Sequence, residues 1–178
     1  MSKRIKGICL TAVFAALTCA LSPISIPTPF GVPITLQTFI ITVTAFLLGI
    51  KAGTAAILCY VLLGVAGLPV FSGFTGGAAV IFGATGGFII CFPLFALIIS
   101  LVFYVNKVIS RVLIGLSAVL ILYTGGIAQF LIISKSGFEV AIIGFIPYFI
   151  KDVIIVLLSY FLCGRIRPTL QKFIQPKR

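Results

Sequence analysis

The sequence predicts an all-α integral membrane protein, with six transmembrane helices in a compact bundle that forms a single domain over residues 1–178. Of the 178 residues, 61% are hydrophobic and 8% are charged, whereas a soluble domain carries roughly 25% charged residues. Long apolar runs alternate with short breaks that hold most of the basic residues. Such a chain cannot cover a soluble surface, so we expect it to face lipid.

Six segments are long and apolar enough, or nearly so, to span a bilayer. A spanning helix needs about 20 mostly apolar residues. We place the helices at 5–22, 34–49, 52–66, 88–105, 112–133 and 147–164. The first segment resembles a secretory signal, but all later segments are also apolar. We therefore interpret it as a retained helix.

The basic residues are distributed asymmetrically between the breaks. The N-terminus, the second and fourth breaks and the tail hold eleven of them, whereas the first, third and fifth breaks hold only Lys135. By the positive-inside rule, both termini are expected to be cytoplasmic, in a multi-pass protein of the cell membrane. Because these residues form no continuous face, the net charge of +11 does not indicate nucleic-acid binding. The eleven are Lys3, Arg4, Lys6, Lys51, Lys107, Arg111, Arg165, Arg167, Lys172, Lys177 and Arg178.

Two uncharged loops, 22–33 and 67–87, are then external. Pro23, Pro27, Pro29 and Pro33 stiffen the first, and the second contains seven glycines that allow its backbone to approach another group closely. External linkers are normally polar, so we expect both apolar loops to be ordered and to fold over the outer helix ends. The glycine-rich loop lacks the phosphate-loop pattern.

Asp152 is the ionisable residue that most strongly suggests a site. We expect Pro147 to begin the sixth helix, which places Asp152 about one turn inside it, after Lys151. Ionisable groups within a membrane span are functional candidates because their burial is costly. Two interpretations stay open: a ligand site, or a mutual ion pair that stabilises the helix end. Glu139, the only other carboxylate, is interpreted as a surface residue beside Lys135.

Other polar and aromatic residues are predicted at the same outer level. Thr35 and Gln37 begin the second helix, Gln129 lies near the outer end of the fifth, and Thr75 lies in the glycine-rich loop. A few polar groups among aromatic side chains, with Phe74 and Phe88 as candidates, are typical of a small-molecule pocket. Gln129 is equally compatible with a bond between helices. Without histidine and with five scattered cysteines, no metal site or cofactor is expected.

Alanine recurs every four residues in the first segment, at Ala12, Ala16 and Ala20. These residues share one helix face, and small side chains let another helix approach closely. The face is predicted either to pack within the domain or to dock another membrane protein.

Three blocks, VPITLQTF at 32–39, GLPVFSGFTGGAAV at 67–80 and GATGGF at 83–88, resemble the BioY family of biotin-specific substrate-binding (S) components of energy-coupling-factor (ECF) transporters. The resemblance implies six helices, external capture of biotin, and docking through Ala12 and Ala16 onto a transmembrane coupling subunit that works with two ATPase subunits. The chain departs from the family where Ile155 occupies the usual lysine position, while Lys151 lies about one turn earlier.

We therefore expect a substrate-binding subunit, not an enzyme, that takes up biotin. On this hypothesis Asp152 accepts the ureido N–H groups and Lys151 holds the carboxylate. Thr75, Gln37 and the backbone around Gly76 and Gly77 complete the site, with Phe74 and Phe88 as aromatic walls. The alternative is a self-sufficient, proton-coupled carrier of biotin or a similar small carboxylate vitamin, with Asp152 carrying the proton.

Overall fold

The computed structural model describes residues 3–28, 33–135 and 137–174, so Pro29, Val32, Lys177 and Arg178 lie outside the described residues. Its helices are α1 (Lys3–Leu21), α2 (Gln37–Val65), α3 (Ala78–Ile81), α4 (Gly86–Ser100), α5 (Val108–Ser134) and α6 (Phe138–Ile174). Two 3-10 turns, η1 (Ser72–Phe74) and η2 (Leu101–Tyr104), and two strands, β1 (Ser25–Ile26) and β2 (Ile34–Thr35), complete it. Within the described residues, five helical stretches are long and apolar enough to cross a membrane.

The difference between six expected and five observed spans lies in α2. This element contains both predicted segments 34–49 and 52–66, and its backbone leaves the helical region at Gly49, where φ is 78° and ψ is −172°. A β-carbon added at Gly53 would lie only 3.0 Å from the α-carbon of Ala45. Eight residues of straight helix rise about 12 Å, so the chain folds back sharply at Gly49. The two halves of α2 pack as separate helices.

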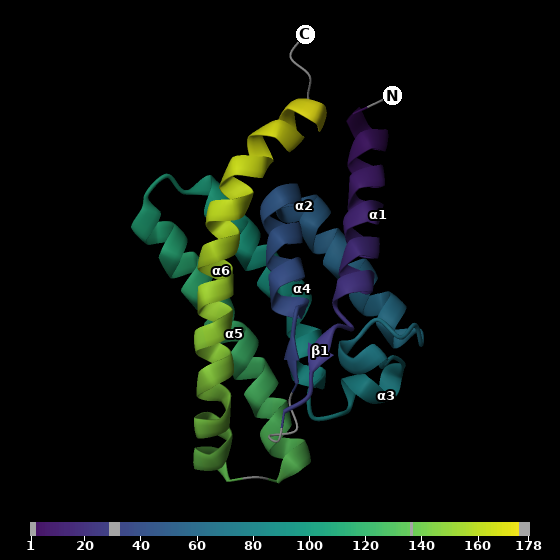
Figure 1. Ribbon diagram of the computed structural model, residues 1–178, viewed down its shortest axis with the longest axis vertical. Coiled ribbons are helices and arrows are strands. Elements are labelled where there is room, and N and C mark those ends of the chain that lie inside the picture. Colours follow the sequence, from purple (N-terminus) through teal and green to yellow (C-terminus); the bar gives the residue numbers. More distant parts are fainter. Residues whose placement is uncertain (1–2, 29–32, 136, 175–178) are drawn as a thin grey trace.

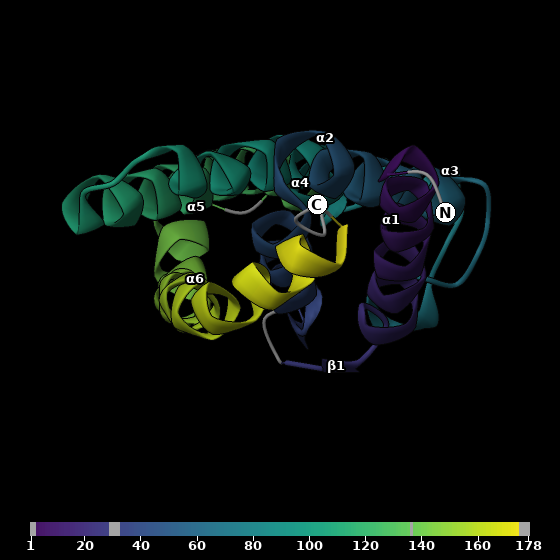
Figure 2. The same ribbon diagram turned by 90° about the horizontal axis from the view of Figure 1, so that it is seen from above.

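The helices form a bundle with α1 and α6 on opposite flanks and α2 and α4 between them (Figures 1 and 2). The start of α1 and the end of α6 lie at one end of the molecule, together with the break in α2 (Figure 1). The strands, α3 and the α5–α6 connection lie toward the opposite end (Figure 1). Among the described basic residues, those of the segments at the first of these ends include Lys6, Lys51, Lys107, Arg111, Arg165 and Arg167, whereas Lys135 and Lys151 do not belong to it.

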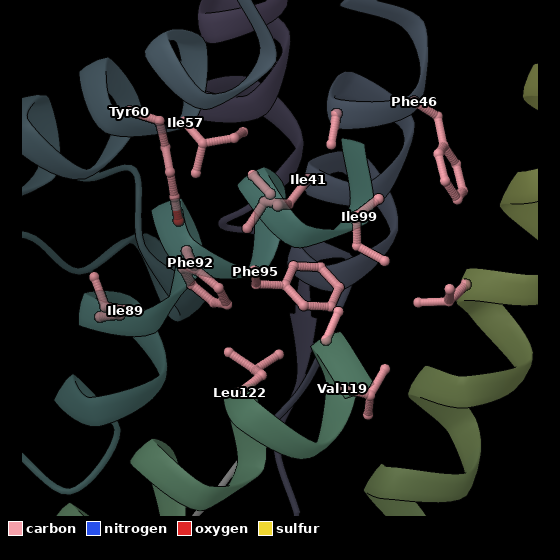
Figure 3. Close-up of a cluster of buried hydrophobic side chains, with 14 of the residues drawn as sticks. Ile41, Phe46, Ile57, Tyr60, Ile89, Phe92, Phe95, Ile99, Val119 and Leu122 are labelled. Atoms are coloured by element: carbon pink, nitrogen blue, oxygen red, sulfur yellow. The ribbon is translucent and has the colours of Figure 1, made fainter. Parts of the chain in front are cut away.

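The hydrophobic core fills the space between α2, α4 and α5 (Figure 3). Tyr60 and Phe95 are fully buried, and the ring of Tyr60 meets that of Phe71 edge-on at 5.7 Å. Outward-facing leucines and isoleucines on every long helix remain exposed, as expected where lipid replaces water. This core places the loop that carries Phe71 firmly over the outer end of α2.

The loops at the opposite end carry regular structure that the all-α expectation did not include. β1 and β2 pair antiparallel, Ser25 with Thr35 and Ile26 with Ile34. The amide of Gly73 donates a hydrogen bond to the carbonyl of Pro23 at 3.0 Å, which joins the two loops. Extended residues around the prolines pair locally because their backbone groups need partners away from water.

Helix α6 is longer than the expected 147–164. It begins at Phe138 and includes Pro147 and Pro168 in its interior, so Pro147 does not begin the helix. Transmembrane helices tolerate interior proline, because neighbouring groups satisfy the freed carbonyl. Asp152 consequently lies fourteen residues after the first residue of the helix, deeper than the one turn that the sequence suggested.

Candidate functional site

A cavity of about 300 Å³ lies under the two loops, among α2, α4, α5 and α6. Its volume is at the lower bound for small-molecule sites. Most of its lining is apolar or aromatic, with a limited set of polar groups. The lining residues are Pro33, Thr35, Gln37, Thr38, Phe71, Ser72, Thr75, Val80, Gly83, Thr85, Phe88, Ile89, Phe92, Leu122, Tyr123, Phe145, Tyr148, Lys151 and Asp152.

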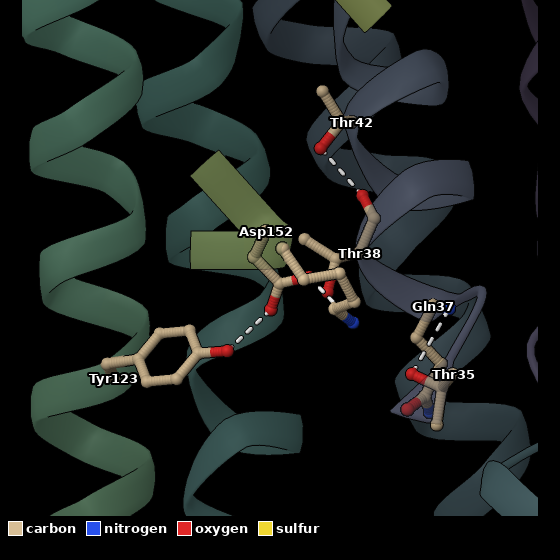
Figure 4. Close-up of polar contacts among 7 residues, drawn as sticks. Thr35, Gln37, Thr38, Thr42, Tyr123 and Asp152 are labelled. Atoms are coloured by element: carbon tan, nitrogen blue, oxygen red, sulfur yellow. Dashed lines mark hydrogen bonds and ion pairs between the residues drawn. The ribbon is translucent and has the colours of Figure 1, made fainter. Parts of the chain in front are cut away.

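Asp152 is the buried charge of this cavity, with only 5% of its surface exposed. The hydroxyl of Tyr123 on α5 donates a hydrogen bond to Asp152 Oδ2 at 2.7 Å (Figure 4). Lys151 Nζ lies 2.8 Å from Asp152 Oδ1. Both expected roles of this pair are therefore compatible, because the two residues form an ion pair and both line the cavity. Each carboxylate oxygen has a second lone pair that can accept a further bond.

Gln37, the first residue of α2, is buried at the cavity wall. Its Nε2 donates to the hydroxyl of Tyr60 at 2.9 Å. Its backbone amide donates to Thr35 Oγ1 at 3.4 Å (Figure 4). The side-chain bond fixes the amide group and leaves its carbonyl oxygen as an acceptor. Thr38, also buried, adds a hydroxyl one residue further along α2.

Two contacts hold the loops over the cavity. Gln129 Nε2 donates to the carbonyls of Ile81 and Gly83, at 2.6 and 2.8 Å. Gln129 thus bonds across elements, the second of the roles expected for it, but its partner is loop backbone. The hydroxyls of Thr28 and Tyr148 lie 2.6 Å apart and tie the first loop to α6.

The residues expected to bind a ligand divide into two groups. Asp152, Lys151, Gln37, Thr75 and Phe88 line the cavity. Phe74, Gly76 and Gly77 are not among the described residues that line it.

Phe74 is 69% exposed, whereas the two glycines are needed to fold the loop. Gly77 has a φ of 94°, which favours glycine, and its amide donates to Gly64 O at 2.7 Å. A β-carbon at Gly76 would collide with the carbonyl of Leu68.

The alanine face of α1 points away from the bundle. Ala12, Ala16 and Ala20 are all exposed, while Ala15 and Thr18 on the other face are buried toward α2. Of the two expected roles, packing within the domain therefore does not apply to the described structure. The face is free to contact lipid or another protein.

Sequence reasoning missed several aromatic residues of the cavity: Phe92, Tyr123, Phe145 and Tyr148. A signal for two of them existed: Phe145, Tyr148 and Asp152 are spaced i, i+3 and i+7, which places them on one helix face. This spacing was overlooked because the sixth helix was expected to begin at residue 147, which left Phe145 outside it. Tyr123 had no comparable signal, since only the packing of α5 on α6 brings it to Asp152.

A lipid-facing bundle with a loop-covered, mostly apolar cavity that holds a few fixed polar groups defines a membrane protein that binds a small solute. The BioY family model matches residues 1–172, and the chain belongs to the BioY family. It is 39% identical over 153 residues to a probable biotin transporter BioY of Pyrococcus horikoshii, covering 84% of this chain and 88% of the relative. It is 49% identical over 89 residues, about half of each chain, to a biotin transporter BioY of Thermotoga maritima.

The fold also matches a solved structure. The crystal structure of the S-component for biotin from an ECF-type ABC transporter superposes with a TM-score of 0.85 and 26% sequence identity, covering 94% of this chain and 95% of that one. The likeness therefore extends over nearly the whole length of both chains.

Proposed function

We propose that this chain is the biotin-binding S-component of an ECF-type ABC transporter. The observation that carries the proposal is the loop-covered cavity itself, whose buried Asp152 is its only carboxylate. Biotin combines an apolar bicyclic body with a ureido group and a carboxylate tail. A mostly apolar chamber with a few fixed polar groups is complementary to that molecule.

The ureido group is recognised at the Asp152 end of the cavity. Its two N–H groups need acceptors, and the chamber offers the Asp152 carboxylate and the Gln37 amide oxygen. Its carbonyl needs a donor, which the hydroxyl of Thr38 supplies, or that of Thr75 when it turns away from its present acceptor, the carbonyl of Ser72. Phe88 and Phe71 enclose the bicyclic body. The charge-assisted bonds to Asp152 are the strongest of this set.

The biotin carboxylate binds Lys151. This lysine is partly exposed and lines the cavity, whereas Ile155, one turn later, does not. The shift of lysine by four residues therefore keeps a cation within the chamber. Lys151 bridges Asp152 and the ligand carboxylate, so its single positive charge attracts both acidic groups.

The end of the bundle that carries both termini faces the cytoplasm. It carries most of the basic residues of the described chain, Lys135 and Lys151 being the exceptions, which favours the cytoplasmic side of a membrane. The cavity then opens to the exterior beneath its two loops. The exposed face of Ala12, Ala16 and Ala20 docks a transmembrane coupling subunit, because small residues permit close helix contact. Two ATPase subunits supply the energy.

Transport measurements in vesicles test this assignment against the proton-coupled alternative. We expect vesicles that contain this chain with the coupling and ATPase subunits to accumulate labelled biotin only when ATP is present. Biotin accumulation by the chain alone, abolished by an uncoupler, would establish the alternative. In the structure Asp152 already has a lysine and a tyrosine as partners, which supports a fixed ligand-binding carboxylate over a mobile proton carrier.

A further inference from the structure

A second cavity lies in the half of the bundle near the chain termini. Its volume is about 110 Å³, and it lies between the first half of α5 and the second half of α6. It shares no lining residue with the larger cavity. Arg111 is its only charged lining residue, and Tyr160 supplies the only other polar side chain; Phe46, Gly115, Val153 and Leu157 are among the apolar remainder.

Arg111 is held at this cavity by fixed contacts. Its Nε donates to the carbonyl of Val105 at 2.8 Å, its Nη1 donates to the hydroxyl of Tyr160, and its guanidinium lies 5.6 Å from the centre of the Tyr160 ring. These two hydrogen bonds use two of the five N–H donors of arginine. The guanidinium therefore keeps donors for another group.

Within the described residues, no side-chain carboxylate lies against Arg111. The chain has only two side-chain carboxylates, Asp152 and Glu139. Asp152 is bonded to Lys151 and Tyr123 in the other cavity, and Glu139 lies in the first turn of α6 at the opposite end of the bundle. Lys107, one turn before Arg111, adds an exposed second cation. The described residues therefore leave positive charge at this cavity that an anion from outside can balance.

The position of this site matches the headgroup region of a bilayer. α5 begins at the end of the bundle where the termini lie (Figure 1), and Tyr104, just before it, is 72% exposed. Exposed tyrosines are enriched at membrane–water interfaces. Leu113 and Leu116 beside the cavity are exposed, so its mouth opens toward acyl chains. Basic pockets between helices on the cytoplasmic side are suited to lipid headgroups.

We propose that this cavity binds an anionic phospholipid, with the phosphate on Arg111 and Lys107 and part of one acyl chain in the space beside Gly115 and Leu157. Both parts of the lipid are required. The cationic pair selects a negatively charged headgroup, and the apolar recess selects a lipid over a soluble phosphate.

Native mass spectrometry of the purified full chain tests this, with phosphatidylglycerol and phosphatidylcholine of identical acyl chains as probes. We expect phosphatidylglycerol to bind about tenfold more tightly. Both lipids offer a phosphate to Arg111, but phosphatidylglycerol has a net negative charge, whereas Arg111 and Lys107 repel the choline ammonium of phosphatidylcholine. Arg111→Gln should abolish that preference. Arg165→Gln, which removes an exposed charge at the same end outside the cavity, should retain it.

Leu157→Trp tests the recess without touching the charge. It should weaken phosphatidylglycerol binding about as much as Arg111→Gln, while the chain still elutes as a monodisperse species. If Arg111→Gln fails to fold, Leu157→Trp decides alone. Equal affinity for the two lipids, an equal effect of Arg165→Gln and Arg111→Gln, or unchanged binding by Leu157→Trp would overturn the proposal.

Discussion

Tyr123 donates a 2.7 Å hydrogen bond to Asp152 across the α5–α6 interface. Both residues are buried, so this contact orients the one carboxylate of the ligand cavity. The hydroxyl of Tyr123 binds Oδ2, while Oδ1 forms the ion pair with Lys151. Tyr123 is thus a positioning residue for ligand recognition.

Tyr123→Phe should weaken biotin binding by about tenfold, because a hydrogen bond to a charged group contributes about 1.5–3 kcal/mol. Isothermal titration calorimetry of the purified chain measures this change. Tyr104→Phe, at an exposed tyrosine remote from the cavity, is the matched control and should bind as the unmodified chain does. Equal affinities of the two variants would remove the positioning role.

Gln129→Leu should loosen the loop that covers the cavity. The change removes both hydrogen bonds to the carbonyls of Ile81 and Gly83, so backbone amides in 78–85 should exchange faster with solvent deuterium. Biotin affinity should fall as the loop becomes less firmly held. Thr124→Val removes only a bond within α5 and should leave exchange in the loop unchanged. Unaltered exchange in Gln129→Leu would show that other contacts close the loop.

Gly49→Ala should destabilise the fold where α2 reverses. A φ of 78° with a ψ of −172° belongs to a region essentially confined to glycine, and placing another residue there costs about 1–3 kcal/mol. A thermal unfolding scan in detergent should show a lower midpoint. Gly144→Ala is the control, since no atom lies within 4 Å of the added carbon. Equal midpoints for the two variants would mean that the break at Gly49 is not required.

Cysteine labelling tests the membrane orientation. In a chain whose five native cysteines are replaced by alanine, Thr75→Cys should react with an impermeant maleimide added to intact cells. Arg165→Cys should react only after permeabilisation, because it lies at the basic end that we propose to be cytoplasmic. Labelling of Arg165→Cys alone in intact cells would invert the proposed topology and place the cavity opening inside.

The sequence predicts the spanning segments because lipid imposes long apolar runs on any helix that crosses it. Even the break in α2 agrees with the expected boundary between 34–49 and 52–66. The start of α6 could not be located from the sequence. Proline usually begins or ends a helix in a soluble protein, but a membrane helix tolerates it in its interior, as α6 does at Pro147. The short strands also escaped notice, because two-residue pairings leave no periodic pattern.

Five of the proposed ligand residues could be placed near one cavity from the sequence, because polar side chains are few in so apolar a chain. Phe74, Gly76 and Gly77 show the limit of that reasoning. A glycine that permits close backbone approach does not reveal which group approaches, and for Gly76 and Gly77 the neighbour is the chain itself, at Leu68 and Gly64.

Direct titration of biotin into the purified, detergent-solubilised chain and its Asp152→Ala variant tests the central claim most directly. The account predicts saturable binding of one biotin per chain that is lost in Asp152→Ala and retained in Glu139→Ala, which removes the only other carboxylate. Absence of biotin binding by the folded chain, or equal affinity of Asp152→Ala and the unmodified protein, would contradict it.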